Sequence, residues 1–299
     1  MRRYGGLWQE GASVAEYEDG VWWSNDGLRL HYRAYAGPAG KPPILCLHGL
    51  TRNARDWEPV VERLAGDWPI FCLDMRGRGE SAYSPDPMTY NGLVYAQDIE
   101  AFLLDRKIER YISFGTSMGG IITMLMAGTR PERFAGVLLN DIGPVVEEAG
   151  LDRIRGYVGK GGQFPTWLHA AHYLRTGFSD TYPGWALEDW LAMAKRLCKL
   201  TQSGRIGFDY DMRIAEPLRV AAGDSGIDMW AAFEGLKDTP ATVVRGEKSD
   251  ILSAATAEEM QRRKPDLEIV EVPNVGHAPV LDEPAAMAAI DALLSRVAV

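Results

Sequence analysis

The stretch FGTSMGG, residues 114–120, holds a serine with one glycine two residues before it and another two residues after it. The preceding RYISF has the apolar, β-rich character of a buried strand, and the following MGGIITMLMAG has that of a buried helix. A residue on so sharp a strand-to-helix turn takes a strained backbone conformation and needs small neighbours, which Gly115 and Gly119 supply. The pattern predicts that the Ser117 hydroxyl stands at the carboxyl edge of a sheet, as a candidate nucleophile rather than an ordinary polar turn residue.

Strand-like runs alternate with helical patterns on both sides of this turn. An early hairpin is predicted by VWWS and LRLHYRAYA, which flank the turn residues Asn25-Asp26-Gly27. Further strands are expected in PILCLHG, PIFCLDMRG, RYISFGTS, FAGVLLNDIG, ATVVRGEKSD and EIVEVPNVGHA. Helices are expected at residues 57–65, 90–105, 117–130, 254–263 and 284–297. The order predicts an α/β fold with a mostly parallel, eight-stranded sheet and flanking helices.

The alternation stops for about ninety residues after FAGVLLNDIG, which is too long for an ordinary connection. This segment contains helical stretches broken by glycine and many aromatic residues. We therefore expect an α/β core of residues 1–143 and 238–299, with an inserted helical cap of residues 144–237. The aromatic residues of the cap either form its own core or line an apolar pocket, and Phe164 and Trp167 are our candidates for the pocket.

A serine nucleophile needs a base within hydrogen-bond reach, and the base needs a group that fixes its tautomer. Of the five histidines, His277 follows the last expected strand and precedes the last expected helix, so it belongs to the same sheet edge as Ser117. His31 lies within an early strand, and we interpret it as structural. His169 and His172 share one face of an expected cap helix, where packing or pocket lining is favoured over a metal pair because no third ligand is evident.

Two aspartates end strands at the correct edge to orient His277. Asp141 follows LLN, and Asp250 lies in the polar loop RGEKSDIL between a strand and a helix. Either choice gives the chain order serine, aspartate, histidine. We predict Asp250 as the acid, because its loop is polar and is anchored by the apolar Ile251 and Leu252, and we keep Asp141 as the alternative that braces the start of the cap.

Together these motifs resemble the α/β-hydrolase fold. G-T-S-M-G corresponds to the nucleophile elbow, H-G-L to the oxyanion loop, S-D-I-L to the segment around the acid and V-G-H-A-P to that around the histidine. The resemblance implies that the amides of Leu50 and Met118 form the oxyanion hole. In D-M-R-G-R-G-E-S we expect Asp74 and Arg76 to brace turns.

Departures from sister groups of this family narrow the chemistry. A serine at the elbow argues against haloalkane dehalogenases and epoxide hydrolases, which use aspartate there. H-G-L in place of H-G-G-G argues against hormone-sensitive-lipase-like esterases, and Ala278 stands where carbon–carbon hydrolases place an aromatic residue.

The expected function is therefore hydrolysis of a carboxylic ester or lactone through an acyl-enzyme on Ser117, with no cofactor and no metal. Two alternatives stay open: a carbon–carbon bond hydrolase acting on a vinylogous diketone, and a ligand receptor that keeps the triad. Some proteins of this fold also run cofactor-free oxygen, halide or cyanohydrin chemistry.

Composition limits the partners. The formal net charge is -9 and no basic run is present, so a nucleic-acid or membrane partner is not expected. The first twenty residues lack the apolar run of a secretory signal, and no segment is long and apolar enough to span a bilayer. Cys46 and Cys72 lie in apolar strands, where free thiols are favoured over a disulfide, although neighbouring strands would permit one. We expect a cytoplasmic protein that binds a small, largely apolar ester or lactone, and the sequence leaves its oligomeric state open.

Overall fold

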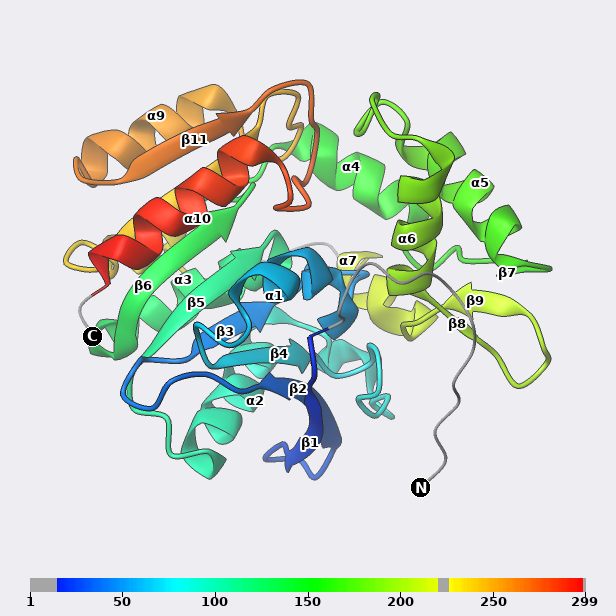
Figure 1. Ribbon diagram of the computed structural model, residues 1–299, viewed down its shortest axis with the longest axis horizontal. Coiled ribbons are helices and arrows are strands. Elements are labelled where there is room, and N and C mark those ends of the chain that lie inside the picture. The colour runs from blue at the N-terminus through cyan, green and yellow to red at the C-terminus, as the bar shows by residue number, and fades with distance from the viewer. Residues whose placement is uncertain (1–14, 220–225, 298–299) are drawn as a thin grey trace.

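The fold is built on a mainly parallel sheet of eight strands (Figure 1), and the computed structural model describes residues 15–219 and 226–297. The sheet order is β1-β2-β4-β3-β5-β6-β10-β11. Only β2 runs against its neighbours, while the strands from β4 to β11 are parallel. The strand bounds are β1 (Glu18–Trp23), β2 (Arg29–Tyr35), β3 (Ile44–Leu47), β4 (Ile70–Asp74), β5 (Tyr111–Thr116), β6 (Phe134–Asn140), β10 (Ala241–Gly246) and β11 (Glu268–Val272).

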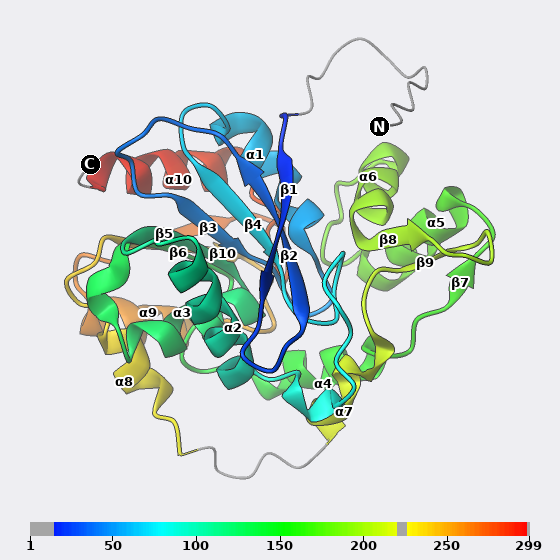
Figure 2. The same ribbon diagram turned by 90° about the horizontal axis from the view of Figure 1, so that it is seen from below.

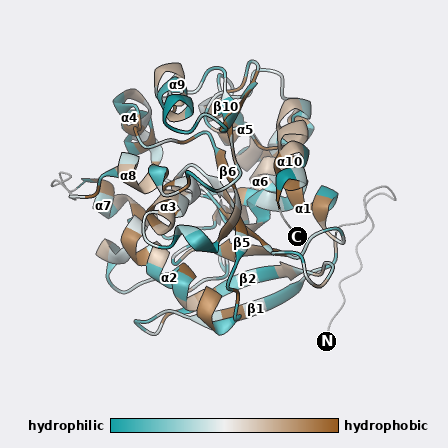
Figure 3. Ribbon diagram, turned by 90° about the vertical axis from the view of Figure 1, so that its left-hand side faces the viewer, coloured by the Kyte–Doolittle hydropathy of each residue, from teal (hydrophilic) through white to brown (hydrophobic). Residues whose placement is uncertain are grey.

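Helices cover both faces of the sheet (Figure 2). One face carries α1 (Glu58–Leu64) and α10 (Pro284–Arg296), and the other carries α2 (Gly92–Asp105), α3 (Met118–Ala127), α8 (Met229–Glu234) and α9 (Ala254–Arg263). Each face has its own buried apolar cluster, because the central strands are buried on both sides. Figure 3 shows the hydrophobic ribbon of β5 at the centre, with mixed hydropathy on the surrounding helices.

The cap lies to one side of the sheet (Figures 1 and 2). It contains α4 (Glu148–Tyr157), α5 (Trp167–Phe178), α6 (Leu187–Leu197) and α7 (Glu216–Arg219), together with a small antiparallel sheet of β7 (Gln163–Phe164), β9 (Ile206–Phe208) and β8 (Cys198–Leu200). A third apolar cluster holds α5, α6 and this small sheet together.

The short 3-10 helices are η1 (Ala54–Trp57), η2 (Pro87–Thr89), η3 (Pro131–Arg133) and η4 (Met212–Ala215).

The expected division at residue 238 does not coincide with a packing boundary, because α8 packs against α3 of the core. An added Cβ at Gly128 would lie 3.1 Å from Ala232 Cα, which shows how closely α3 and α8 approach. The described residues do not include 1–14, 220–225 and 298–299. These ranges fall within the expected domains, and the first contains most of the stretch in which no secretory signal was expected.

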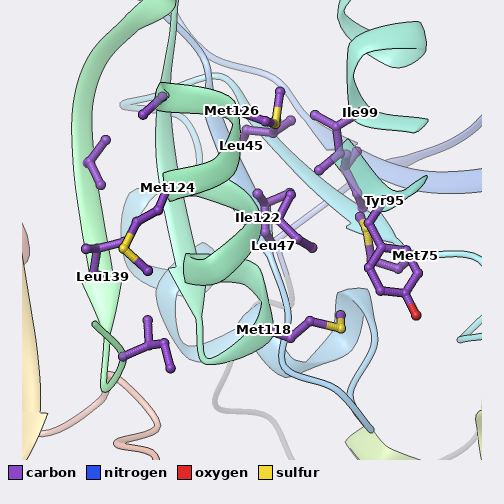
Figure 4. Packing of buried hydrophobic residues seen from close by; sticks show 14 of the residues in the cluster. Leu45, Leu47, Met75, Tyr95, Ile99, Met118, Ile122, Met124, Met126 and Leu139 are labelled. Carbon is purple, nitrogen blue, oxygen red and sulfur yellow. The ribbon is translucent and has the colours of Figure 1, made fainter. Parts of the chain in front are cut away.

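The helix α3 begins at the candidate nucleophile and is buried along most of its length. Figure 4 shows Ile122 of α3 beside Leu47 of β3, with Met118 at the start of the helix. Ile122 and Leu47 are each at most 1% exposed. This packing holds the start of α3 rigidly against the sheet, so the residue that precedes it has a fixed position.

Candidate active site

Ser117 lies on the turn between β5 and α3, with backbone angles φ 51° and ψ −114°. This positive φ is unusual for a residue with a side chain. The flanking glycines are required by close contact: an added Cβ at Gly119 would lie 2.0 Å from the carbonyl oxygen of Leu47, and one at Gly115 would lie 2.6 Å from the backbone of Gly119. The turn therefore has the geometry that the sequence predicts.

His277 lies in the loop between β11 and α10 and faces Ser117. Its Nε2 is 2.8 Å from Ser117 Oγ, so the serine hydroxyl donates to the imidazole when Nδ1 carries the ring proton. The imidazole is nearly buried, with 9% of the side chain exposed. The structure thus brings together the two residues that the sequence predicts as nucleophile and base.

The carboxylate that contacts the imidazole belongs to Asp141, which directly follows β6. Its Oδ2 is 2.8 Å from His277 Nδ1, and the side chain is fully buried. The same carboxylate accepts hydrogen bonds from the amide of Gly246 at 2.8 Å and from the hydroxyl of Ser249 at 2.7 Å. Three donors from two loops therefore fix Asp141 in the orientation that holds His277 in one tautomer.

This geometry corrects the expectation that Asp250 is the acid. Asp250 forms a two-pronged ion pair with Arg153 of α4, with N–O distances of 2.5 and 2.7 Å. Burial by itself raises the pKa of Asp250, but the hydrogen bonds and charge of Arg153 outweigh it and lower the pKa below its usual value. The physical reason for the exchange is that Gly246 and Ser249 of this loop donate to Asp141, whereas the Asp250 carboxylate is held by Arg153 of the cap.

The predicted oxyanion residues Leu50 and Met118 both line a cavity with Ser117. The H-G-L loop is fixed by His48, whose Nε2 accepts from the Met75 amide at 3.1 Å while Nδ1–H donates to the Gly49 carbonyl at 2.7 Å. Burial lowers the pKa of His48 to about 4, so the ring is neutral and keeps this donor and acceptor pattern.

Arg78 is a further residue of the site that the sequence reading did not single out. Its guanidinium is fully buried and donates to the carbonyl of Leu50 at 3.0 Å and to the hydroxyl of Tyr95 at 2.8 Å. It therefore holds the carbonyl end of the oxyanion loop. The D-M-R-G-R-G-E-S motif contains Arg78, but nothing in the motif separates its role from that of Arg76.

The bracing residues of that motif are buried as well. Asp74 accepts from the Ala54 amide at 2.6 Å and contacts His31 Nδ1 at 2.7 Å, while Arg76 pairs with Asp98 at 2.6 Å. His31 is therefore part of a structural ion network.

Three cavities lie between the core and the cap. The first, of about 50 Å³, is lined by Ser117, His277 and Arg52. A second, of about 210 Å³, shares Arg52 and Tyr157 with the first and extends under the cap. A third, of about 300 Å³, lies on the other side of Ser117, against the start of α3.

The described residues that line these three cavities include neither Phe164 nor Trp167, which corrects their assignment as pocket residues. Phe164 lies in the apolar core of the cap, with its ring centre 5.1 Å from that of Tyr173, and Trp167 packs against the same core. Other aromatic residues of the cap do line the cavities, namely Tyr157, Tyr173, Phe178 and Tyr182.

Other candidate sites have local explanations. His169 contacts the hydroxyl of Thr166 at the start of α5. The cysteines Cys46, Cys72 and Cys198 are buried free thiols, although Cys46 and Cys72 are register partners on β3 and β4. Within residues 15–219 and 226–297 no group of three or more His, Cys, Asp or Glu side chains is placed to hold a metal ion. In the same part of the chain, no helix has both the length and the apolar character needed to cross a membrane.

The arrangement has a clear chemical capacity. His277 is placed to take the proton of Ser117, and Asp141 is placed to stabilise the imidazolium that forms. These contacts turn a weak nucleophile into one that attacks an electrophilic carbon.

Comparison with known proteins agrees with this capacity. A profile of the Alpha/beta hydrolase family matches residues 44–290. A 3-hydroxybutyrate-oligomer hydrolase of Cupriavidus necator is 35% identical over 269 residues, which are 87% of this chain and 90% of the relative. A 2-(acetamidomethylene)succinate hydrolase of Mesorhizobium japonicum is 29% identical over 240 residues, or 79% of this chain and 81% of the relative. Among solved structures, an alpha/beta hydrolase from Novosphingobium aromaticivorans shares 55% identity and a TM-score of 0.91, covering 95% of this chain and 100% of that chain.

Proposed function

The chain belongs to the alpha/beta hydrolase family and is a hydrolase, and from this premise we propose that it cleaves carboxylic esters or lactones through an acyl-enzyme on Ser117. The observation that carries the proposal is the continuous line of 2.8 Å contacts from Ser117 through His277 to Asp141. Neither contact needs rearrangement before the first proton transfer.

The proposed reaction has two matched halves. Ser117 Oγ attacks the ester carbonyl carbon while its proton passes to His277 Nε2, and the amides of Leu50 and Met118 stabilise the oxyanion. The imidazolium then returns that proton to the alcohol oxygen as the carbon–oxygen bond breaks. Water attacks the acyl-enzyme in the same way, giving its proton to His277 and its hydroxyl to the acid, and Ser117 regains its proton.

The substrate is proposed to be a small molecule, and the protein to act in the cytoplasm without a nucleic-acid, membrane or cofactor partner. The named substrate of the Cupriavidus necator relative is a hydroxybutyrate oligomer, which favours an ester. The named substrate of the Mesorhizobium japonicum relative carries an acetamido group. An acetamido group contains an amide, so cleavage of a less reactive acyl bond by the same triad is the second candidate, beside the carbon–carbon cleavage of a vinylogous diketone that the sequence left open.

The first test is Ser117→Ala, assayed on aryl esters, lactones and a vinylogous diketone. We expect hydrolysis to fall by about 10⁴-fold or more at unchanged melting temperature, with residual activity from the oxyanion hole and binding. A fluorophosphonate probe should label the wild type and not the variant. Ser295→Ala, at an exposed serine of α10, is the matched control and should keep full activity. A Ser117→Ala enzyme with more than about a tenth of wild-type activity would contradict the proposal, and a labelled protein that cleaves only the diketone would favour the second candidate.

A further inference from the structure

Two chemically different cavities meet at Ser117. We call the polar cavity the space of about 50 Å³ lined by Ser117, His277, Arg52, Asp56, Trp57 and Asn140, among others. We call the apolar cavity the space of about 300 Å³ lined by Ser117, Met118, Ile121, Ile142, Leu151 and Leu218, among others. The two linings share Leu50, Ser117 and Ile154. An ester carbonyl at Ser117 therefore sends one half of the substrate into each cavity.

His277 decides which half goes where. The imidazole must deliver its proton to the oxygen of the leaving alcohol, so that oxygen has to lie beside Nε2. His277 is in the lining of the polar cavity and, among the described residues, is absent from that of the apolar cavity. We infer that the alcohol half of the substrate occupies the polar cavity and the acyl half occupies the apolar cavity.

Two residues in the lining of the polar cavity each carry a buried polar atom that has no protein partner among the described residues. The buried Trp57 Nε1–H and Asn140 Oδ1 have no hydrogen-bond partner within the described part of the chain. Buried polar atoms of this kind are costly unless a ligand or water satisfies them. Both atoms are closed to solvent, so the polar groups that the cavity offers to a substrate hydroxyl are the side chains of Arg52 and Asp56 in its lining.

Arg52 adds a charged donor to this cavity. The aliphatic part of Arg52 lies close to the nucleophile, because both residues border the same point beside Gly49. A Cβ added to Gly49 would lie 3.5 Å from Arg52 Cγ and 3.8 Å from Ser117 Cβ. Nη1 contacts Asp56 Oδ1 at 3.2 Å, and a further hydrogen bond joins the guanidinium to the side chain of Tyr182, so these two contacts do not use all five N–H donors of the group. Polar atoms on the alcohol, near the ester oxygen, can therefore reach Arg52. Beyond Arg52 the space continues into the cavity of about 210 Å³ under the cap.

The apolar cavity differs because its few polar side chains already have protein partners. The Tyr90 hydroxyl donates to Asp211 at 2.7 Å, and that of Tyr95 accepts from Arg78 at 2.8 Å. Asn91 uses its side chain to cap α2 and to contact the Met88 carbonyl. The remaining surface is mostly aliphatic, so an acyl chain gains from burial there, whereas a hydroxyl would lose its hydration without a new partner.

The inference rests on the proposed function and specifies its substrate class: esters of an aliphatic acyl group of several carbons with an alcohol that carries a second polar group close to the ester oxygen. Isomeric esters with exchanged halves test it directly. The wild-type enzyme should cleave 2-hydroxyethyl hexanoate with a kcat/KM at least about tenfold above that for hexyl glycolate, because the second ester buries its hydroxyl among aliphatic side chains.

A variant then locates the acyl half. Leu151→Phe narrows the apolar cavity, so the kcat/KM ratio of 2-hydroxyethyl hexanoate to 2-hydroxyethyl acetate should fall about tenfold. Leu168→Phe makes the same chemical change at an exposed residue of α5 that is 43% exposed, and it should leave the ratio within about twofold of wild type. Ile121→Phe narrows the same cavity from α3 and replaces Leu151→Phe if that variant does not fold.

The possible failures are distinguishable. A wild type that cleaves hexyl glycolate as fast as its isomer overturns the assignment and leaves the proposed function standing. If folded Leu151→Phe or Ile121→Phe keeps the wild-type ratio of kcat/KM for the hexanoate and acetate esters, the assignment of the acyl half is also overturned and the proposed function still stands. A wild type that is inert to both isomers and to the fluorophosphonate probe overturns the proposed function and this inference with it.

Discussion

At the scale of single residues, the orientation of one carboxylate separates a catalytic role from a structural one. Asp141 has a φ of 57° and receives donors from Gly246, Ser249 and His277. A carboxylate held on three sides cannot rotate away from the imidazole, and it selects the tautomer with the proton on Nδ1. Asp250 lies on the same edge of the sheet but has its charge satisfied by Arg153.

Replacing each aspartate by asparagine should separate these roles. We expect Asp141→Asn to lower kcat by about 10³- to 10⁴-fold in the folded fraction, because the amide favours the wrong tautomer of His277. Asp250→Asn should lower kcat by less than about tenfold, since the contacts among Ser117, His277 and Asp141 remain. Steady-state kinetics together with melting temperatures check both. The reverse pattern would show that the catalytic acid moves to Asp250 during turnover.

The sequence predicted Ser117 and His277, because each lies in a motif whose spacing is tied to a strand and a loop at one sheet edge. It predicted Asp250 instead of Asp141 as the acid, and this choice was wrong because both follow parallel strands that end at that same edge and residue types did not separate them. The difference depends on which carboxylate receives the Gly246 and Ser249 donors. Such contacts depend on backbone angles within one loop, and residue types alone do not specify them.

At the scale of elements, α4 connects the cap to the catalytic loops. Arg153 of α4 pairs with Asp250, and an added Cβ at Gly150 would lie 2.4 Å from the Asp250 carbonyl oxygen. The same helix supplies Leu151 and Ile154 to the lining of the apolar cavity. The position of α4 therefore sets the width of that cavity.

Loss of this ion pair should loosen substrate binding. We expect Arg153→Gln to raise KM for 2-hydroxyethyl hexanoate by up to about fivefold with little change in kcat, because a pair about a third exposed contributes roughly 1 kcal/mol or less. Added salt should raise KM of the wild type towards the value of the variant. Arg155→Gln, at a more exposed arginine of α4 that pairs with Glu148, is the control. Equal KM changes in both variants would assign the effect to the net charge of α4.

The strands and longer helices of the core were predicted closely, since they are long enough to show their periodicity, whereas the six-residue α8 was placed in the cap by mistake. The cap was predicted as helical, and its small sheet was missed because β7, β8 and β9 have only two or three residues each. Aromatic content did not reveal that Phe164 packs inside the cap, because a cap core and a pocket wall have the same composition.

At the scale of the whole molecule, folding changes the pKa values of buried histidines in opposite directions. Burial lowers the pKa of His48 to about 4. Burial alone would also lower the pKa of His31, but contacts with Asp74 and Asp19 outweigh it and raise the pKa. Because its pKa is raised, His31 makes its full contribution to the free energy of unfolding below about pH 6.5, and this contribution is lost at higher pH. His48 has a lowered pKa and behaves in the opposite way: its neutral ring costs no stability above about pH 6.5 and destabilises the fold at lower pH.

Stability should consequently fall as the pH drops from about 6.5 to about 4. In this range the unfolded chain binds a proton at His48 and the folded protein does not, which costs up to about 3 kcal/mol of the free energy of unfolding. Urea unfolding at a series of pH values should show this loss in the wild type and a shallower slope in His48→Gln. Carboxylates titrate in both proteins, so the difference between the slopes isolates His48. Parallel slopes would mean that His48 is protonated in the folded state.

The long sequence separations within the triad have a consequence for how the protein is made. His277 lies 160 positions after Ser117 in the sequence. Gly246 and Ser249, whose amide and hydroxyl hold Asp141, lie 105 and 108 positions after Asp141. Since a ribosome releases the chain from its N-terminus, the elbow, both aspartates and the whole cap emerge before the base does. Catalysis is therefore among the last properties that the nascent chain acquires, because the segment after β11 carries both the base His277 and the helix α10 that covers one face of the sheet.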